Sequence, residues 1–109
     1  MVHSTIRMLI PHEKQGEALE ILGSMIEQTQ CEPGCVSCRL YRDVEDARVI
    51  MFEELWASDE DVQRHLQSDK YHRVLLVVEM AAEPPEIRFD TIDHSTGVET
   101  IEQARIQAL

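Results

Sequence analysis

The sequence predicts an α+β domain whose strands and helices follow the order βαββαβ. Four segments alternate apolar and polar residues with a period of two, which is typical of half-buried strands. Between them lie segments whose apolar residues recur every three or four positions, as on one face of a helix. At 109 residues the chain is long enough for one domain and too short for two ordinary ones.

The first strand is expected over residues 2–10, where Ile6 and Met8 share one face and Arg7 lies on the other. Pro11 ends this strand. An amphipathic helix follows over about residues 13–30, and the Pro-Gly pair at 33–34 breaks it.

The second strand covers residues 35–43 and alternates through Val36, Cys38 and Leu40. The acidic segment 43–46 predicts a hairpin turn. Residues 48–56 are rich in β-branched and aromatic residues, so we expect them to form a strand antiparallel to the second one.

A capping box begins at Ser58, whose hydroxyl can accept a hydrogen bond from a free amide of the first helical turn. The short helix that it starts should bend near residues 68–69 and continue as a second helix from Tyr71 to about residue 82. The proline pair at 84–85 ends that helix, and residues 87–93 alternate again as a fourth strand.

This order is the ferredoxin-like unit, a four-stranded antiparallel sheet with helices on one face. Apolar residues lie on both faces of the third strand, with Ile50 and Phe52 on one and Val49, Met51 and Leu55 on the other. Because helices cover only one face, we expect a homodimer joined sheet to sheet. The domain is expected over residues 1–94, and the tail 95–109 should form a short helix that packs on the dimer.

The net charge of −11 makes nucleic acid and anionic membranes unfavourable partners, because both would be repelled. No apolar run approaches the roughly 20 residues that span a bilayer. The first residues show no signal-peptide pattern, so we expect a cytoplasmic protein.

Three cysteines lie within eight positions, at Cys31, Cys35 and Cys38. Their odd number argues against a disulfide framework, and no second cysteine or histidine pair completes a metal site. Cys35 and Cys38 should point to opposite faces of a strand, since they are three positions apart. We therefore expect reduced, mostly buried thiols and no bound metal.

One group of residues could perform chemistry. Phe52, Glu54 and Trp56 share one face of the third strand, and the helix that follows should return over this face and bring His65 toward Trp56. Tyr71 comes directly after the bend. Together they would make an apolar cavity with a few convergent polar groups, as small-molecule sites have.

Four further residues could assist this site. Asp61 and Asp69 lie four positions on either side of His65 and could orient its imidazole. Tyr41 and Arg7 could contact a substrate, Arg7 through an anionic group. Ordinary structural roles remain open for every residue of the group: core packing for the aromatic residues and histidine, and a solvated or salt-bridged carboxylate for Glu54.

Four motifs carry a resemblance: Glu-Pro-Gly-Cys at 32–35, Tyr-Arg-Asp at 41–43, Glu-Leu-Trp at 54–56, and the segment 65–71. With them the chain, over roughly residues 2–94, resembles the antibiotic biosynthesis monooxygenase domain family. That family consists of dimeric α+β barrels and includes quinol oxygenases that use neither metal nor flavin. The resemblance implies that His65 is the recurrent pocket histidine, with Glu54 and Trp56 as the family's Glu-x-Trp pair.

The haem-degrading branch of the family relies on an asparagine, a tryptophan and a histidine ligand. Here the tryptophan position is His65, the ligand position is Leu75, and the chain contains no asparagine. Haem degradation is therefore disfavoured. The resemblance instead implies a cofactor-independent monooxygenase acting on a small aromatic or quinol substrate.

In that mechanism His65 is the base or proton shuttle, Glu54 orients it or the substrate, and Trp56 and Tyr71 are aromatic walls. Two alternatives remain. The same histidine could serve an isomerase of a small carbonyl or sugar phosphate, or the protein could be a non-catalytic dimer that binds a metabolite.

Overall fold

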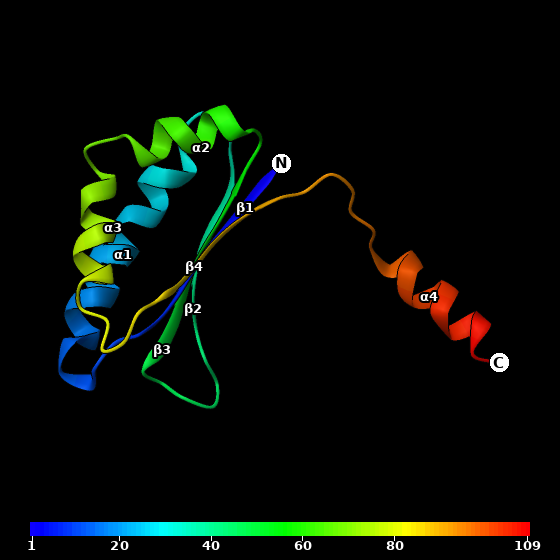
Figure 1. Cartoon of the computed structure of the whole chain (residues 1–109), viewed down its shortest axis with the longest axis horizontal. Coiled ribbons are helices and arrows are strands. Elements are labelled where there is room, and N and C mark those ends of the chain that lie inside the picture. Colours follow the sequence, from blue (N-terminus) through cyan, green and yellow to red (C-terminus); the bar gives the residue numbers. More distant parts are fainter.

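The computed structural model describes all 109 residues as a four-stranded antiparallel sheet with three helices on one face and a fourth helix apart from it (Figure 1). The strands are β1 (Val2–Leu9), β2 (Cys35–Arg42), β3 (Val49–Trp56) and β4 (Glu86–Thr91), in the order β2-β3-β1-β4. The helices are α1 (Gln15–Gln30), α2 (Asp59–Leu66), α3 (Tyr71–Val78) and α4 (Val98–Gln107), and the 3₁₀ turn η1 (His12–Lys14) leads into α1. The predicted α+β class and the βαββαβ order are confirmed.

The core lies between the sheet and helices α1 and α3. Alternate residues of the two central strands point into it, and the apolar stripes of the two helices cover them. Its buried members are Ile6, Met8, Ile10, Ala18, Leu22, Met25, Cys38, Ile50, Phe52, Tyr71, Val74 and Val77. A smaller cluster of Val2, Trp56 and Val62 lies beside it under α2.

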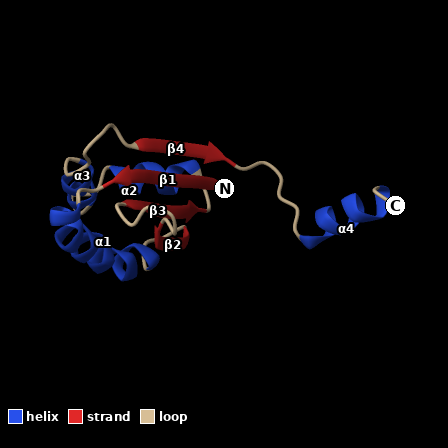
Figure 2. Ribbon diagram, turned by 90° about the horizontal axis from the view of Figure 1, so that it is seen from below, coloured by secondary structure: helices blue, strands red, loops and turns tan.

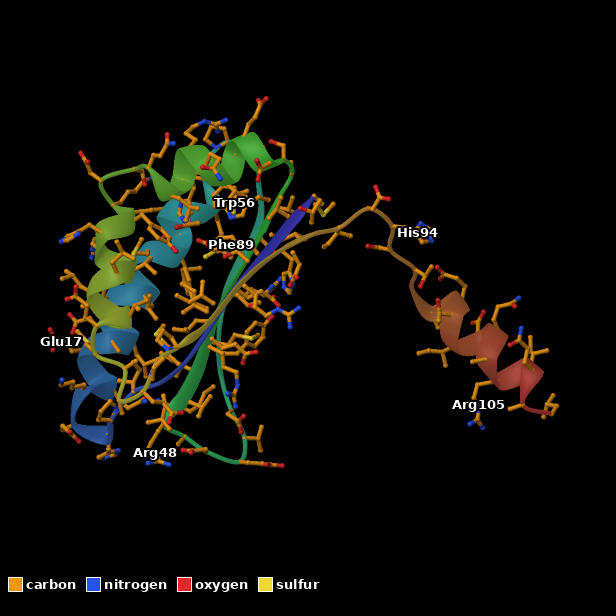
Figure 3. All side chains as sticks on the ribbon, in the orientation of Figure 1. Glu17, Arg48, Trp56, Phe89, His94 and Arg105 are labelled. Carbon is orange, nitrogen blue, oxygen red and sulfur yellow. The ribbon has the colours of Figure 1, made fainter.

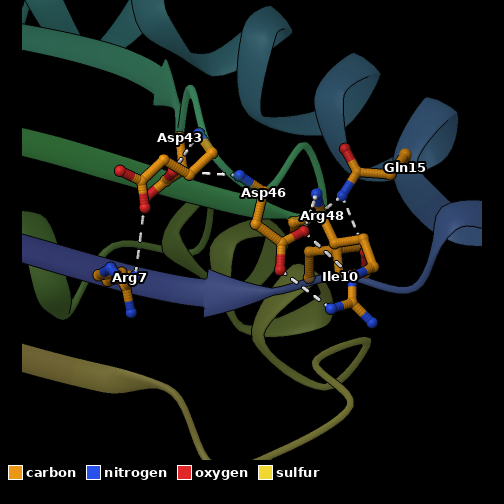
Figure 4. Close-up of polar contacts among 7 residues, drawn as sticks. Arg7, Ile10, Gln15, Asp43, Asp46 and Arg48 are labelled. Atoms are coloured by element: carbon orange, nitrogen blue, oxygen red, sulfur yellow. Dashed lines mark hydrogen bonds and ion pairs between the residues drawn. The ribbon is translucent and has the colours of Figure 1, made fainter.

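The first residue of α1 fastens this helix to the sheet. The buried Gln15 donates hydrogen bonds from Nε2 to the backbone oxygens of Ile10 at 2.8 Å and Arg48 at 3.0 Å (Figure 4). One side chain therefore ties together the end of β1, the start of α1 and the residue before β3.

A β-bulge in β2 overturns two sequence predictions. The register shifts between Cys35 and Ser37, so that Cys35 faces Trp56 and Cys38 faces Glu54. Both cysteines therefore pack against the helix-covered face of the sheet, and the prediction of opposite faces is wrong. Val36, expected beside Cys38, is instead 53% exposed, because the bulge inserts one extra residue into the strand.

The thiols are also less enclosed than predicted. Cys38 is buried, Cys35 is half-buried and Cys31 is exposed, and all three are free. Burial raises the pKa of Cys38 to about 12 and that of Cys35 to about 11, with the Glu54 carboxylate adding to the effect. These two thiols stay protonated at neutral pH, so neither is an activated nucleophile.

The second face of the sheet carries no helix (Figure 2). Its side chains are mixed in polarity. Met51 and Leu55 are half-buried there, while Glu53 accepts hydrogen bonds from His3 at 3.0 Å and Tyr41 at 3.4 Å. The sheet-to-sheet homodimer predicted for this face stays a prediction.

Helix α4 projects away from the rest of the chain, and each of its residues is exposed (Figures 1 and 2). The predicted C-terminal helix is therefore present, and its packing on a dimer stays a prediction. Helix α3 ends at Val78, earlier than the expected residue 82. None of the helices combines the length and apolarity that a membrane crossing requires.

Candidate functional site

His65 is held inside the protein by the local structure of α2. The predicted cap is present, since Ser58 Oγ accepts a hydrogen bond from the Asp61 amide at 3.2 Å and starts the helix directly after β3. The helix then crosses the end of the sheet with Val62 and His65 turned inward. The His65 side chain is 1% exposed.

The imidazole of His65 lies between two carboxylates. Its Nδ1 atom is 2.9 Å from Oε2 and 3.0 Å from Oε1 of Glu32. Its Nε2 atom is 2.8 Å from Oε2 of Glu54, a residue that is 2% exposed. The second contact is an ion pair by distance, although its angles fall outside those of a good hydrogen bond. A bare lone pair on Nε2 would repel the Glu54 carboxylate at this distance, so the contact favours a proton on Nε2 of His65.

The carboxylates control the protonation of this histidine. Burial by itself would lower the pKa of His65, but contact with Glu54 first and Glu32 second outweighs burial and holds the pKa above its ordinary value. The positive imidazolium form is therefore stabilised in the folded protein.

Two aromatic rings enclose the imidazole. The Trp56 ring centroid lies 4.6 Å from that of His65 with the planes tilted by 35°, and the Tyr71 ring meets it edge-on at 5.1 Å. Figure 3 places Trp56 between the sheet and the helices. Burial and the nearby Glu54 charge raise the pKa of Tyr71 to about 12, so its phenol stays neutral. The structure thus brings together Glu54, Trp56, His65 and Tyr71, and buries Phe52 on the same sheet face.

Sequence reasoning missed Glu32. We expected Asp61 or Asp69 to orient His65, but Asp61 pairs with Arg64 at 2.8 Å and with Ser58 at 2.8 Å. The carboxylate that contacts Nδ1 of His65 is Glu32, which lies in the loop between α1 and β2. In this loop Gly34 adopts a φ of 83°. The Glu-Pro-Gly-Cys motif at 32–35 was the available signal, and it was interpreted as a helix break and as a family motif, without a role for the Glu32 side chain.

Arg7 and Tyr41 do not reach this site. They lie on the helix-free face of the sheet, where they help to line a half-open cavity of about 160 Å³ near the β2–β3 hairpin. In that region Arg7 is 3.8 Å from Asp43 (Figure 4). This is the one cavity of the structure, and it is separate from His65. The residues expected to share one site therefore lie on two faces of the sheet, and the cavity expected beside His65 is absent.

No group of three or more histidine, cysteine or acidic side chains is arranged to hold a metal ion. Leu75, at the position of a haem ligand in the resemblance, is 45% exposed on α3 and offers no ligand atom.

Comparison with known proteins agrees with this architecture. Residues 1–75 match the family model described as antibiotic biosynthesis monooxygenase, which covers the sheet's first three strands and the site. The chain belongs to the antibiotic biosynthesis monooxygenase family. In sequence it is 29% identical over 77 residues to an uncharacterized protein of Synechocystis, a match that covers 70% of this chain and 52% of that relative. The chain thus spans about half the length of the relative that it matches.

Solved structures share the fold at low sequence identity. A candidate antibiotic biosynthesis monooxygenase from Deinococcus radiodurans has a TM-score of 0.81 and 15% identity, covering 89% of this chain and 97% of the other. A conserved protein from Methanosarcina mazei has a TM-score of 0.77 and 23% identity, covering 82% and 89% respectively. These structural similarities establish the fold of this chain.

Proposed function

We propose that the protein is a cofactor-independent monooxygenase that oxidises a small quinol or other electron-rich phenol with dioxygen. The observation that supports this proposal is the buried imidazole of His65 between Glu32 and Glu54, enclosed by Trp56 and Tyr71. Family membership agrees with an oxygenase.

Each group has a role in the proposed reaction. Glu32 accepts a hydrogen bond from Nδ1–H of His65 and fixes the ring, while Nε2 of His65, beside Glu54, accepts one proton from the substrate hydroxyl. The imidazole can do this only in its neutral form, so activity depends on the fraction of protein in which His65 has lost its Nε2 proton. Trp56 and Tyr71 exclude water and hold the flat substrate.

The chemistry balances without a further reactant. A dihydroxynaphthalene plus O₂ gives a hydroxynaphthoquinone plus water: the ring gains one oxygen atom, and two hydrogens leave with the other. Four electrons pass from the arene to dioxygen. The phenolate formed by proton removal is the electron donor, so the protein supplies only proton transfer, orientation and a dry site.

The side chains around His65 are in contact with one another, so substrate must displace some of them on entry. A homodimer joined through the helix-free sheet face remains part of the proposal, and would leave the His65 sites on the outer, helix-covered sides of the two sheets. The protein would act on a small molecule, without nucleic acid or membrane as a partner.

An isomerase acting on a sugar phosphate is less well supported. Phosphate binding calls for cationic groups, and the cations near the site are already paired. Lys70 is 3.7 Å from Glu32, and Arg64 is 2.8 Å from Asp61. Arg7 lies on the opposite sheet face.

Oxygen uptake tests the proposal. Purified protein given dihydroxynaphthalenes and hydroquinones should consume dioxygen above the spontaneous rate, and His65→Ala should reduce this at least tenfold, as expected for loss of a general base. His94→Ala, at an exposed position, is the matched control. Uptake that survives in His65→Ala would remove the proposed role. Deuterium exchange into a phosphorylated ketose without oxygen uptake would favour the isomerase.

A further inference from the structure

The cavity on the helix-free face of the sheet lies outside the His65 site and has no part in the proposed reaction. Its volume is about 160 Å³, and it is half-open. Two apolar residues of β3 line it, Val49, which is 8% exposed, and Met51, which is half-buried. Met51 pairs with Arg7 on β1 and with Tyr41 on β2, so these two side chains stand on either side of it. The cavity thus has an apolar floor between a cation and an aromatic ring.

Two walls of this cavity are fixed by the protein itself. Oδ1 of Asp43 accepts hydrogen bonds from the backbone amides of Glu45 at 2.7 Å and Asp46 at 3.2 Å, which orients the carboxylate within the β2–β3 turn. The hydroxyl of Tyr41 donates a hydrogen bond to Glu53 at 3.4 Å. Groups that are positioned before a ligand arrives lose little conformational freedom on binding it.

The two charged groups of the cavity are only loosely paired with each other. Nη2 of Arg7 is 3.8 Å from Oδ2 of Asp43, beyond the roughly 2.7–2.9 Å of a charge-assisted hydrogen bond (Figure 4). Both side chains are partly exposed, at 52% and 33%. The cavity therefore presents a fork of N–H donors on one strand and a carboxylate oxygen at the end of another.

Charge decides which ligand suits this arrangement. A simple anion would pair with Arg7 but would be repelled by Asp43 beside it and by the net charge of −11. A simple cation would pair with Asp43 and be repelled by Arg7. A zwitterion satisfies both groups at once, and its bonds are stronger than those of an uncharged ligand.

We propose that this cavity binds a free α-amino acid with an apolar side chain. The carboxylate of the amino acid accepts hydrogen bonds from Arg7, its ammonium group donates to Oδ2 of Asp43, and its side chain lies over Met51 beside the ring of Tyr41. The volume of about 160 Å³ is below the roughly 300 Å³ of the smallest drug-sized pockets, which suits a side chain such as that of leucine or methionine. The site is on the sheet face opposite His65, so the inference does not rest on the proposed oxygenase function.

A second copy of the chain is the other candidate occupant, because the expected homodimer uses the same sheet face. The cavity lies at the hairpin end of this face, where the amide of Asp43 donates a hydrogen bond of 2.9 Å to the backbone oxygen of Val49. The middle of the face is further along the strands, where Thr5 pairs with Glu53. A dimer centred on the sheet would therefore leave the cavity at its rim.

Amide chemical shifts of the full chain, followed by NMR during titration with leucine, test the proposal. Saturable shifts should appear at Arg7, Asp43 and Met51, and His65 should not shift. Isocaproate and isoamylamine keep the leucine side chain, but each carries only one of the two charges. Each should bind at least about tenfold more weakly than leucine, as expected for the loss of a charge-assisted hydrogen bond.

Two variants test the assigned groups. Arg7→Gln and Asp43→Asn should each weaken leucine at least about tenfold. Asparagine keeps an oxygen for the turn amides, so Asp43→Asn preserves the hairpin. Arg88→Gln is the matched control, since this exposed arginine lies on the same sheet face at β4, and it should leave the dissociation constant within about twofold. Thermal unfolding of each variant verifies that it is folded.

Three results would overturn the inference: equal affinity for leucine and its two singly charged analogues, unchanged affinity in Arg7→Gln, or no saturable shift at the cavity with leucine, methionine or phenylalanine. If no amino acid binds and Arg7→Gln changes the sedimentation mass, the cavity is a contact between two copies and the inference is wrong. Amino acid binding without any oxygen uptake from quinols would leave the inference standing while the proposed oxygenase fails.

Discussion

The Nδ1 atom of His65 lies 2.9 Å from Oε2 of Glu32, although 33 positions separate the two residues in the chain. This contact joins α2 to the loop between α1 and β2. With Glu54 on Nε2, it makes a carboxylate–imidazole–carboxylate row whose central ring is fully buried.

Glu32→Gln should lower turnover and shift its pH dependence. The variant keeps the size of the side chain and removes the charge that helps hold the pKa of His65 above its ordinary value. The His65–Glu54 pair would then lose its proton at lower pH, so the acid limb of the rate profile should move to lower pH while the maximal rate falls severalfold. Rates of oxygen uptake across pH measure both effects. An unshifted profile would mean that Glu32 has only a structural role, and Glu27→Gln, on the exposed side of α1, is the control.

Stability should fall as pH rises because of His65. Its folded pKa lies above the unfolded value of 6.5, so the folded state binds more protons in this range and the free energy of unfolding decreases with pH. This contribution is complete below 6.5 and is lost as the pH passes the raised folded pKa. The free energy of unfolding can be measured by urea denaturation at several pH values. It should decrease less steeply with pH in His65→Gln than in the original chain. His94→Gln, at an exposed site, should keep the original dependence of the unfolding free energy on pH.

Gly34→Ala should destabilise the protein. Gly34 has a φ of 83°, which costs an L-residue about 1–2 kcal/mol, and an added Cβ would overlap the Asp61 carboxylate. We expect a loss of at least about 2 kcal/mol in the free energy of unfolding, together with a displaced Glu32 loop. Gly23→Ala, on α1 with nothing within 4 Å, should instead stabilise by about 0.5–1 kcal/mol. Equal effects of the two changes would contradict the role given to Gly34.

Arg7→Gln and Tyr41→Phe should leave kcat/KM within twofold. Both side chains lie on the helix-free face near the β2–β3 hairpin, so they can contact no substrate held at His65. Steady-state oxygen uptake is the measurement. A loss of tenfold or more in either variant, with normal unfolding, would place substrate on the other face of the sheet.

Most of the fold could be predicted from the sequence because apolar residues recur every second position in the strands and every three or four positions in the helices. Both patterns depend on neighbouring residues alone. It also placed Glu54, Trp56 and His65 together, since strand alternation and a capped helix directly after the strand leave few arrangements. The prediction failed where non-local geometry decides. The bulge at Cys35 and Ser37 depends on pairing with β3, Glu32 reaches His65 through a long-range loop contact, and the exposure of Phe89 depends on which strand lies at the edge.

The pKa of His65 tests the central claim most directly. Titration of its imidazole by heteronuclear NMR should give a value above 6.5, with Glu32→Gln and Glu54→Gln each lowering it, because the two carboxylates together outweigh burial. Nδ1 should stay protonated in the neutral ring, held by Glu32. A pKa at or below 6.5 that neither substitution changes would contradict the proton-transfer site proposed here.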